Sequence, residues 1–253
     1  MQAVLAIVYR EYLIRLTSPL WLFFDLVVPL MYLLMFGVGL DRAIGLGIAL
    51  EGRAVSYNEF FLAGVLSMSC FGSAINQSYG FFVDRDNGIF YEFLTYPMTR
   101  GQFLVGKILF QCLMSIVQAA LTLSCAVWIL EIQLRWEFLL PLIAGVVIGI
   151  AAWFFFLAIF AFRIRRNDTF NTVINVAYFV LMFVSSMFYP LDSAPAWLRT
   201  LAMGNPLTWH TDVLRYFTIG LGDPQIVLWE IIGFGLFLVA SFWVAVKSLQ
   251  KAV

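Results

Sequence analysis

The chain contains apolar runs that are too long and too free of charge for a fold in water. One of them, Thr169 to Leu191, carries no Asp, Glu, Lys or Arg. A helix of about 20 apolar residues crosses the roughly 30 Å hydrocarbon core of a bilayer. Hydrophobic residues make up 62% of the 253 positions and charged residues 12%, against about 45–50% and about 25% in soluble domains. The sequence therefore predicts an integral membrane protein.

Six runs are long enough to span a bilayer. They lie near residues 20–40, 60–82, 103–130, 138–162, 169–190 and 226–246. None shows the period-two alternation of a membrane strand, so each predicts a helix. We therefore expect an all-α integral membrane protein in which residues 20–253 form one six-span domain.

The basic residues predict the orientation of the spans. With the N-terminus inside, ten Lys and Arg residues fall on the cytoplasmic side and five on the outer side. Cytoplasmic loops are enriched in these residues. Arg163, Arg165 and Arg166, between the fourth and fifth spans, form the densest cluster. An even number of spans then places both termini in the cytoplasm.

Residues 1–19 precede the first span and have the pattern of an amphipathic helix. Arg10, Glu11 and Arg15 fall on one side of an otherwise apolar helix, as in helices that lie in the plane of the lipid headgroups. The alternative is a simple extension of the first span. Pro19 favours a break, because proline disfavours helix in the residue before it.

The cytoplasmic loop from Asp84 to Arg100 predicts a short surface helix. Asp84 or Asp86 can cap its start, Gly88 to Thr95 can form two turns, and Pro97 can end it. Its apolar residues would project from a charged surround. They are Ile89, Phe90, Phe93 and Leu94. From composition alone, both a solvated turn anchored by aromatics and a docking surface remain open.

The outer loop from Met187 to Tyr216 holds two short amphipathic segments, which start after Pro195 and after Pro206. Proline suits the first turn of a helix, and Asp192 and Asn205 are suitable cap or turn residues. Each segment is too short to cross the bilayer and too apolar to lie free in water. We expect both to enter the outer leaflet as re-entrant helices.

In the order of these features, the chain resembles the permeases of type-2 ATP-binding-cassette (ABC) exporters over nearly its whole length. That family includes daunorubicin-type drug exporters and exporters of polysaccharides and nodulation signals. The resemblance implies that the cytoplasmic loop is a coupling helix that docks in a groove of a separate ATPase. The matching residues are Asp84, Arg85, Asp86, Gly88, Glu92, Leu94, Thr95, Pro97 and Arg100.

The outer loop carries the more specific part of the resemblance, and implies an external gate. The matching residues are Tyr189, Pro190, Pro195, Trp197, Asn205, Pro206, Asp212 and Arg215. Two departures occur: Tyr189 stands where Phe is commoner, and Trp209 to Thr211 is bulkier than the usual small residues. They leave the preference of the gate open.

Several polar residues lie inside the predicted spans. Gln111, Ser115, Gln118 and Thr122 recur at helical spacing on one face, and Asn171 and Asn175 share a face of the fifth span. Either packing between helices or a substrate path accounts for them. Asp25 lies inside the first span, where charge is costly, and can serve transport or pair with Arg15 or Lys107.

Catalytic and metal chemistry find little support. His210 is the single histidine, and no second ligand stands at a metal-site spacing, so we expect no metal site and no catalytic residue. The small-residue face of Gly145, Gly149 and Ala152 permits close helix approach, and favours internal packing over the alternative of a dimer seam. No phosphate-binding loop ending in Lys-Ser or Lys-Thr occurs, so ATP and Mg²⁺ are expected on a partner.

We therefore expect the membrane subunit of an ATP-driven exporter in the inner membrane of a prokaryote, with two copies of an ATPase and a second permease copy. The substrate is expected to be hydrophobic or amphipathic; a lipid-linked saccharide is the alternative. An ion-coupled secondary transporter is the rival from another class. An intramembrane enzyme would need a nucleophile and base together. The balanced charge of 15 basic and 15 acidic residues gives no reason to expect nucleic acid as a partner.

Overall fold

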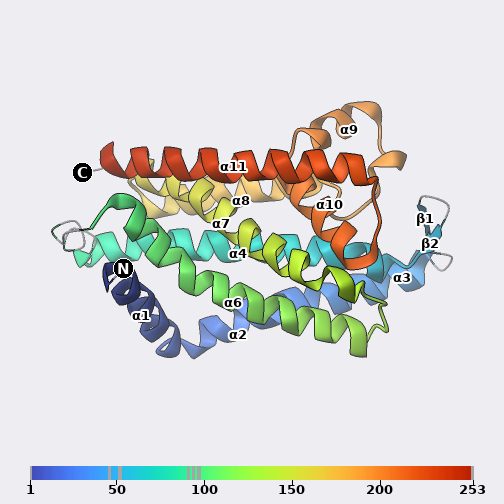
Figure 1. Cartoon of the computed structure of the whole chain (residues 1–253), viewed down its shortest axis with the longest axis horizontal. Coiled ribbons are helices and arrows are strands. Elements are labelled where there is room, and N and C mark those ends of the chain that lie inside the picture. The colour runs from blue at the N-terminus through green and yellow to red at the C-terminus, as the bar shows by residue number, and fades with distance from the viewer. Residues whose placement is uncertain are drawn as a thin grey trace.

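Helices built from the long apolar segments run side by side along the long axis of the molecule (Figure 1). The computed structural model describes residues 2–44, 47–50, 53–89, 92, 95 and 98–251. In chain order its elements are α1 (Gln2–Leu16), α2 (Pro19–Tyr32), the π-helical η1 (Leu33–Gly37), α3 (Val38–Ile44), β1 (Ile48–Leu50), β2 (Arg53–Val55), α4 (Tyr57–Asp86), α6 (Arg100–Trp128), η2 (Trp136–Phe138), α7 (Leu139–Arg163), α8 (Asn167–Phe183), η3 (Leu191–Ser193), α9 (Ala196–Met203), α10 (Pro206–Ile219) and α11 (Pro224–Lys251).

The first two helices are separate, as Pro19 predicts. Ser18 leaves the helical conformation (φ −125°, ψ 61°), and Pro19 begins α2 without needing an N–H donor. In Figure 1, α1 lies at an angle to α2 at one end of the bundle. Farther along, α2 passes into α3 through the π-helical turn of η1, which follows Pro29 by four residues.

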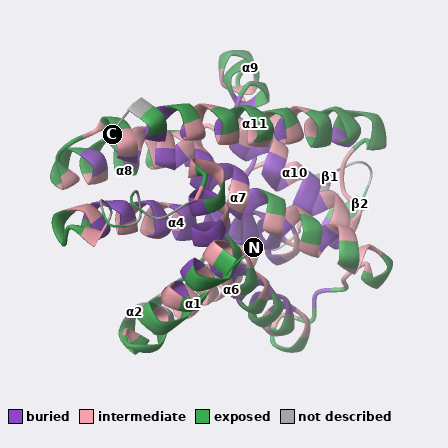
Figure 2. Cartoon of the chain, turned by 60° about the vertical axis from the view of Figure 1, so that its left-hand side comes forward, coloured by how far each residue is buried: buried purple, intermediate pink, exposed green. Residues whose placement is uncertain are grey.

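α4 is the central helix. It begins with a capping box, in which Ser56 accepts from the Glu59 backbone and Glu59 accepts from the Ser56 backbone. α7, α10, α6, α2 and α8 all pack against it. In its most apolar stretch 83% of the residues are buried, against 17% in α11 at the edge (Figure 2). It is also the least hydropathic of the long helices, which suits a helix that meets protein on every side.

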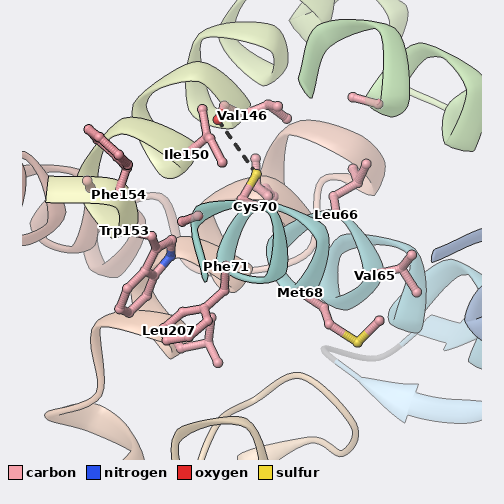
Figure 3. Packing of buried hydrophobic residues seen from close by; sticks show 14 of the residues in the cluster. Val65, Leu66, Met68, Cys70, Phe71, Val146, Ile150, Trp153, Phe154 and Leu207 are labelled. Atoms are coloured by element: carbon pink, nitrogen blue, oxygen red, sulfur yellow. Dashed lines mark hydrogen bonds between the residues drawn. The ribbon is translucent and has the colours of Figure 1, made fainter. Parts of the chain in front are cut away.

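The core centres on the contact of α4 with α7, with α10 closing one side (Figure 3). Phe71 of α4 lies between the Trp153 ring of α7, 4.4 Å away between centroids, and the Tyr178 ring of α8, 4.7 Å away. Next to it, the Cys70 thiol donates to the Val146 carbonyl at 3.6 Å. These contacts pack α4 closely against both α7 and α8.

The outer surface of the described chain is apolar and much of its polar content is inside. Large apolar side chains of α2, α8 and α11 are exposed, including Leu20, Phe179 and Trp229. Ser67, Gln77 and other polar residues of α4 are buried. This distribution is the reverse of that in water and fits a protein surrounded by lipid.

Five helical segments of the described chain are long and apolar enough to cross a membrane. They are Phe23–Arg42, Tyr57–Asp86, Arg100–Trp128, Trp136–Arg163 and Pro224–Gln250. The predicted fifth span, 169–190, is helical only as far as Phe183. There Asn205 donates to the Leu181 and Val184 carbonyls, at 2.7 and 3.2 Å, so a side chain from the outer loop ends α8 earlier than hydropathy alone predicts.

The start of α1 and the end of α11 lie at the same end of the bundle, together with the end of α4 and the start of α6 (Figure 1). The opposite end carries α9, α10 and an antiparallel hairpin in which Ile48 pairs with Val55.

Candidate functional site

A cavity of about 300 Å³ lies along α4, between α2 and α8, with one contribution from α6. Its wall combines aromatic and polar side chains. The polar ones are Asp25, Ser69, Ser73, Asn76, Gln118 and Asn175, beside Tyr32 and Tyr178. Phe24, Phe179 and Asn175 of its rim are exposed, so the cavity opens at the surface between α2 and α8.

Pro29 in α2 explains one of the polar contacts in the cavity wall. Pro29 has no N–H, so it leaves the carbonyl of Asp25, four residues earlier, without its helical donor. The Nε2 group of Gln118 in α6 donates to that carbonyl instead. Gln118 also accepts from the Ser73 hydroxyl at 3.5 Å, which joins α2, α4 and α6 at one point.

The Asp25 carboxylate is paired. Arg15 of α1 lies 3.0 Å from Oδ2, and the Asn76 amide of α4 donates to Oδ1 at 3.0 Å. Arg15 also donates to Gln111 of α6 at 3.1 Å. Of the two partners proposed for Asp25 from the sequence, the structure therefore selects Arg15, and four helices meet in this polar network.

The polar face predicted for α6 is present and fully buried. Ser115 and Thr122 donate back to carbonyls of their own helix, at 2.9 and 3.0 Å, while Gln111 and Gln118 reach across to α1 and α2. Gln118 alone of these four lines the cavity. The face thus serves helix packing along most of its length.

On α8, Asn175 lines the cavity and Asn171 does not. Asn175 donates to the Asn171 carbonyl at 2.7 Å, and Asn171 donates to Asn167 at 2.9 Å. Of the five residues predicted for a substrate path, the structure brings Gln118 and Asn175 to one cavity and leaves Gln111, Ser115 and Asn171 outside its wall.

A buried ionic cluster lies near the end of α4 that leads to the α4–α6 connection. Lys107 of α6, 2% exposed, reaches Asp84 at 2.6 Å and Glu11 of α1 at 3.1 Å. Arg10 pairs with both acids, and Gln77 donates to Glu11 at 3.1 Å. Removing one partner from such a cluster costs about 3–5 kcal/mol, because a buried charge is left uncompensated. Hydropathy and motif reading missed the cluster, since its members are far apart in the sequence.

The predicted coupling segment is described in part. The expectation that Asp84 or Asp86 caps its helix is wrong: α4 continues to Asp86, and Asp84 is 3% exposed inside the ionic cluster. Asp86 is exposed beside Arg85, which stacks over Phe82. Gly88 has φ +75°, a conformation that favours glycine. Leu94 and Pro97 lie outside the described residues.

The remaining described parts of the segment are short. Thr95 donates to the Glu92 carbonyl at 2.7 Å, a local turn contact. Arg100 begins α6, where Thr99 and Gln102 form a capping box. The return from the loop into the bundle is therefore held by a defined helix start.

Two short helices occur in the outer loop where the prolines predict them. α9 follows Pro195, and α10 begins at Pro206 with the Asn205 side chain accepting from the Leu207 N–H at 2.9 Å. Tyr189 donates from its hydroxyl to the Phe183 carbonyl, next to Pro190. Trp197 is 65% exposed on α9.

Arg215 fastens α10 to the centre of the bundle. Its guanidinium donates to the Ser186 carbonyl at 2.8 Å and the Phe60 carbonyl at 3.3 Å, and lies 4.0 Å from the Phe60 ring centroid. Asp212, one turn earlier, pairs with Arg215 and accepts from the Ser186 hydroxyl at 2.6 Å. Asp212 and Arg215, which both belong to the residues that carry the family resemblance, thus hold the outer loop against α4.

His210 is a core residue. Its ring stacks on Phe234 of α11, with centroids 4.9 Å apart, and Nδ1 lies 2.9 Å from the Ser67 hydroxyl. A Cβ on Gly149 would lie 2.2 Å from Nε2, so glycine makes room for the ring. The small face of α7 therefore serves internal packing, as its sequence indicates. Within the described ranges, no three His, Cys, Asp or Glu side chains are grouped to hold a metal.

An apolar exterior, a polar cavity between helices and charge clusters at both ends define a polytopic membrane protein of the transport class. The chain belongs to the ABC-2 type transporter family, whose family model matches residues 2–218. It is a permease subunit of an ABC transporter and a multi-pass membrane protein, and membership implies partnership with an ABC ATPase subunit.

Relatives of known name agree with this family. A Cyanophora paradoxa protein named as a transport permease, ycf38, is 26% identical over 265 residues, 93% of this chain and 88% of the relative. A protein of Escherichia coli K12 named as a probable multidrug ABC transporter permease, YbhR, is 23% identical over 70% of this chain and 49% of its own length. The daunorubicin resistance permease DrrB1 of Streptomyces coeruleorubidus is 24% identical over 83% of this chain and 74% of its own.

Proposed function

We propose that this permease exports a hydrophobic or amphipathic small molecule from the cytoplasm or the inner leaflet, driven by a separate ATPase. The observation that carries the proposal is the cavity between α2 and α8, whose wall mixes aromatic rings with Asp25, Gln118 and Asn175. Such a wall suits a substrate with an apolar body and a polar group.

Six spans with both termini in the cytoplasm complete the proposed topology. α8, at 17 residues, reaches about 25 Å at about 1.5 Å per residue, and residues 184–190 supply the rest of the crossing. The basic cluster Arg163, Arg165 and Arg166 at the α7–α8 connection supports a cytoplasmic position for that end. A prokaryotic inner membrane is the proposed location.

A homodimer is the proposed assembly. Asn175 and Thr172 are exposed on α8, where lipid would leave polar groups poorly satisfied. A second copy seated against α2 and α8 would cover them and join two cavities into one path. α11, whose exposed face is apolar, is left to face lipid.

Two ATPase copies, which hold ATP and Mg²⁺, are proposed to drive the cycle through the loop of residues 84–100. The loop leaves α4 just after the ionic cluster of Lys107, Asp84 and Glu11, which also fixes α1 and α6. Movement of the loop would therefore move three helices together. Such rigid-body switching is a common form of transport transition.

The most direct test is to purify the chain with its ATPase and measure ATP hydrolysis in nanodiscs against panels of amphipathic drugs, lipids and glycans. Stimulation by amphipathic compounds is expected, with loss in Asn175→Leu. Val176→Ala is the control: it lies beside Asn175 on the exposed face but outside the cavity wall. Stimulation by glycans alone would favour the lipid-linked saccharide alternative.

The names of the relatives support the drug-like substrate, since one is a probable multidrug permease and another a daunorubicin resistance permease. The rival, an ion-coupled secondary transporter, predicts transport without ATP. Transport in vesicles that stops when a proton or sodium gradient is collapsed, and continues without ATP, would refute the ATP-driven proposal.

A further inference from the structure

A second cavity, of about 720 Å³, lies at the end of the bundle that carries α9 and α10. It is bounded by η3, α9, α10 and the first half of α11, and Phe60 of α4 also lines it. None of the five residues predicted for the substrate path lines it. Its volume suits a drug-sized ligand.

The wall of this cavity is acidic. Its charged members are Asp192, Asp212, Asp223 and Glu230 against Arg199 and Arg215. Both arginines are occupied by protein partners: Arg215 pairs with Asp212 and two carbonyls, and Arg199 donates to the Leu191 carbonyl at 3.2 Å beside Asp192. With four acidic and two basic side chains, the wall has a net negative formal charge.

Two polar atoms of the wall are buried without a partner. Glu230 Oε2 on α11 and Thr208 Oγ1 on α10 accept or donate no hydrogen bond within the described part of the chain. Thr208 is 2% exposed. Buried polar groups are nearly always satisfied, and two of the six buried atoms without a partner in the described chain belong to residues of this wall.

Aromatic residues also line this cavity. Trp209 and Trp229 line the cavity, and the Trp209 indole is held by its hydrogen bond to the Met203 carbonyl at 2.7 Å. The face of an indole ring attracts a cation, the more so when water is excluded. Phe60 is already covered by Arg215, so the two tryptophans are the rings that remain for a ligand.

From these features we propose that this cavity binds an amphipathic organic cation, with the Glu230 carboxylate as its counter-charge, Trp209 and Trp229 as its aromatic wall and Thr208 as a polar contact.

The test uses two probes of the same shape and opposite charge, tetraphenylphosphonium and tetraphenylborate. Equilibrium dialysis of each against the full chain in nanodiscs is compared with empty nanodiscs, which removes lipid partitioning. Saturable binding is expected for the cation and only the empty-disc level for the anion. Equal saturable binding of both probes, or none of the cation, would overturn the proposal.

Variants then locate the site. Glu230→Gln removes the charge at constant shape and is expected to weaken cation binding at least tenfold. Glu137→Gln is the matched control, an exposed carboxylate paired with Arg135 at 3.0 Å outside the cavity wall, and should leave binding unchanged. Undiminished affinity in Glu230→Gln would refute the assignment.

If the Glu230→Gln variant aggregates, the Trp229→Leu variant tests the site instead. Trp229 is exposed, so its replacement leaves the core intact. A several-fold loss of cation affinity supports the site, and full affinity refutes it. The assay needs neither ATPase nor transport. A failure of the export proposal and a failure of this one are therefore separate results.

Discussion

At the scale of single residues, side chains donate hydrogen bonds to backbone carbonyls that have no N–H donor within their own helix. Pro29 withholds a donor from the Asp25 carbonyl, and Gln118 of another helix supplies it. Asn205 likewise donates to two carbonyls at the end of α8. In both cases a backbone group left without its helical partner is satisfied inside the protein, as an apolar surround requires.

Gln118→Leu is expected to lower the free energy of unfolding by about 1 kcal/mol, because the Asp25 carbonyl loses its donor. In a Pro29→Ala background, residue 29 regains an N–H for the same carbonyl, so the same substitution should cost less. Unfolding followed in mild detergent for all four combinations gives the coupling between the sites. Equal costs in both backgrounds would contradict the role given to Gln118.

At the scale of elements, close contact between helices depends on where small residues stand. α10 packs against α7 because Gly145 and Gly149 admit Leu214 and His210, and against α11 through Phe234. The same helix is tied to α4 through Arg215. A helix of 14 residues, shorter than a bilayer crossing needs, is thus held by contacts with three neighbouring helices.

Gly149→Ala is expected to lower the midpoint of thermal unfolding, because its new methyl group would overlap the His210 ring; overpacking of this kind costs about 1–3 kcal/mol. Gly235→Ala on α11 is the control, since nothing lies within 4 Å of the position its Cβ would take. It should be neutral or slightly stabilising. If the two variants melt alike, the fit between His210 and Gly149 is not tight.

Gly88→Pro tests the coupling segment, because proline cannot take the φ of +75° found at this turn. Glu92→Arg tests its charge. Substrate-stimulated ATP hydrolysis should be abolished in both, while the amount of inserted permease stays at the wild-type level. Stimulation that persists at full rate would show that the segment does not couple the two subunits.

At the scale of the whole molecule, two faces of the bundle differ in what they expose. The face between α2 and α8 carries the cavity and exposed polar residues such as Asn175, whereas α11 presents an apolar face. The first suits a second copy and the other suits lipid.

A cysteine cross-link distinguishes these faces. In a chain whose three native cysteines are replaced by alanine, Val176→Cys on α8 should yield a covalent dimer with a short bifunctional reagent. Val239→Cys on α11 is also exposed and should remain monomeric on a denaturing gel. Cross-linking through α11 instead would place the interface on the other face.

Much of this arrangement follows from local patterns. Apolar runs predicted the long helices, and Pro19, Pro195 and Pro206 predicted where shorter ones begin. The polar face of α6, formed by Gln111, Ser115, Gln118 and Thr122, was correctly predicted. Contacts between residues far apart in the sequence could not be predicted, because no local sequence pattern relates Lys107 to Asp84 or His210 to Gly149. The end of α8 was misjudged for the same reason, since Asn205 lies 21 residues beyond Val184.

The central position of α4 bears on how the chain is made. It is the least hydropathic of the long helices, and two of its serines find partners on helices synthesised later: Ser67 with His210 of α10 and Ser73 with Gln118 of α6. During translation it therefore enters the membrane before those partners exist. A truncated chain ending after α4 should consequently insert poorly in a glycosylation-mapping assay, and one extended through α10 should insert fully. Biogenesis of this permease then depends on the insertion machinery holding α4 until the bundle can close around it.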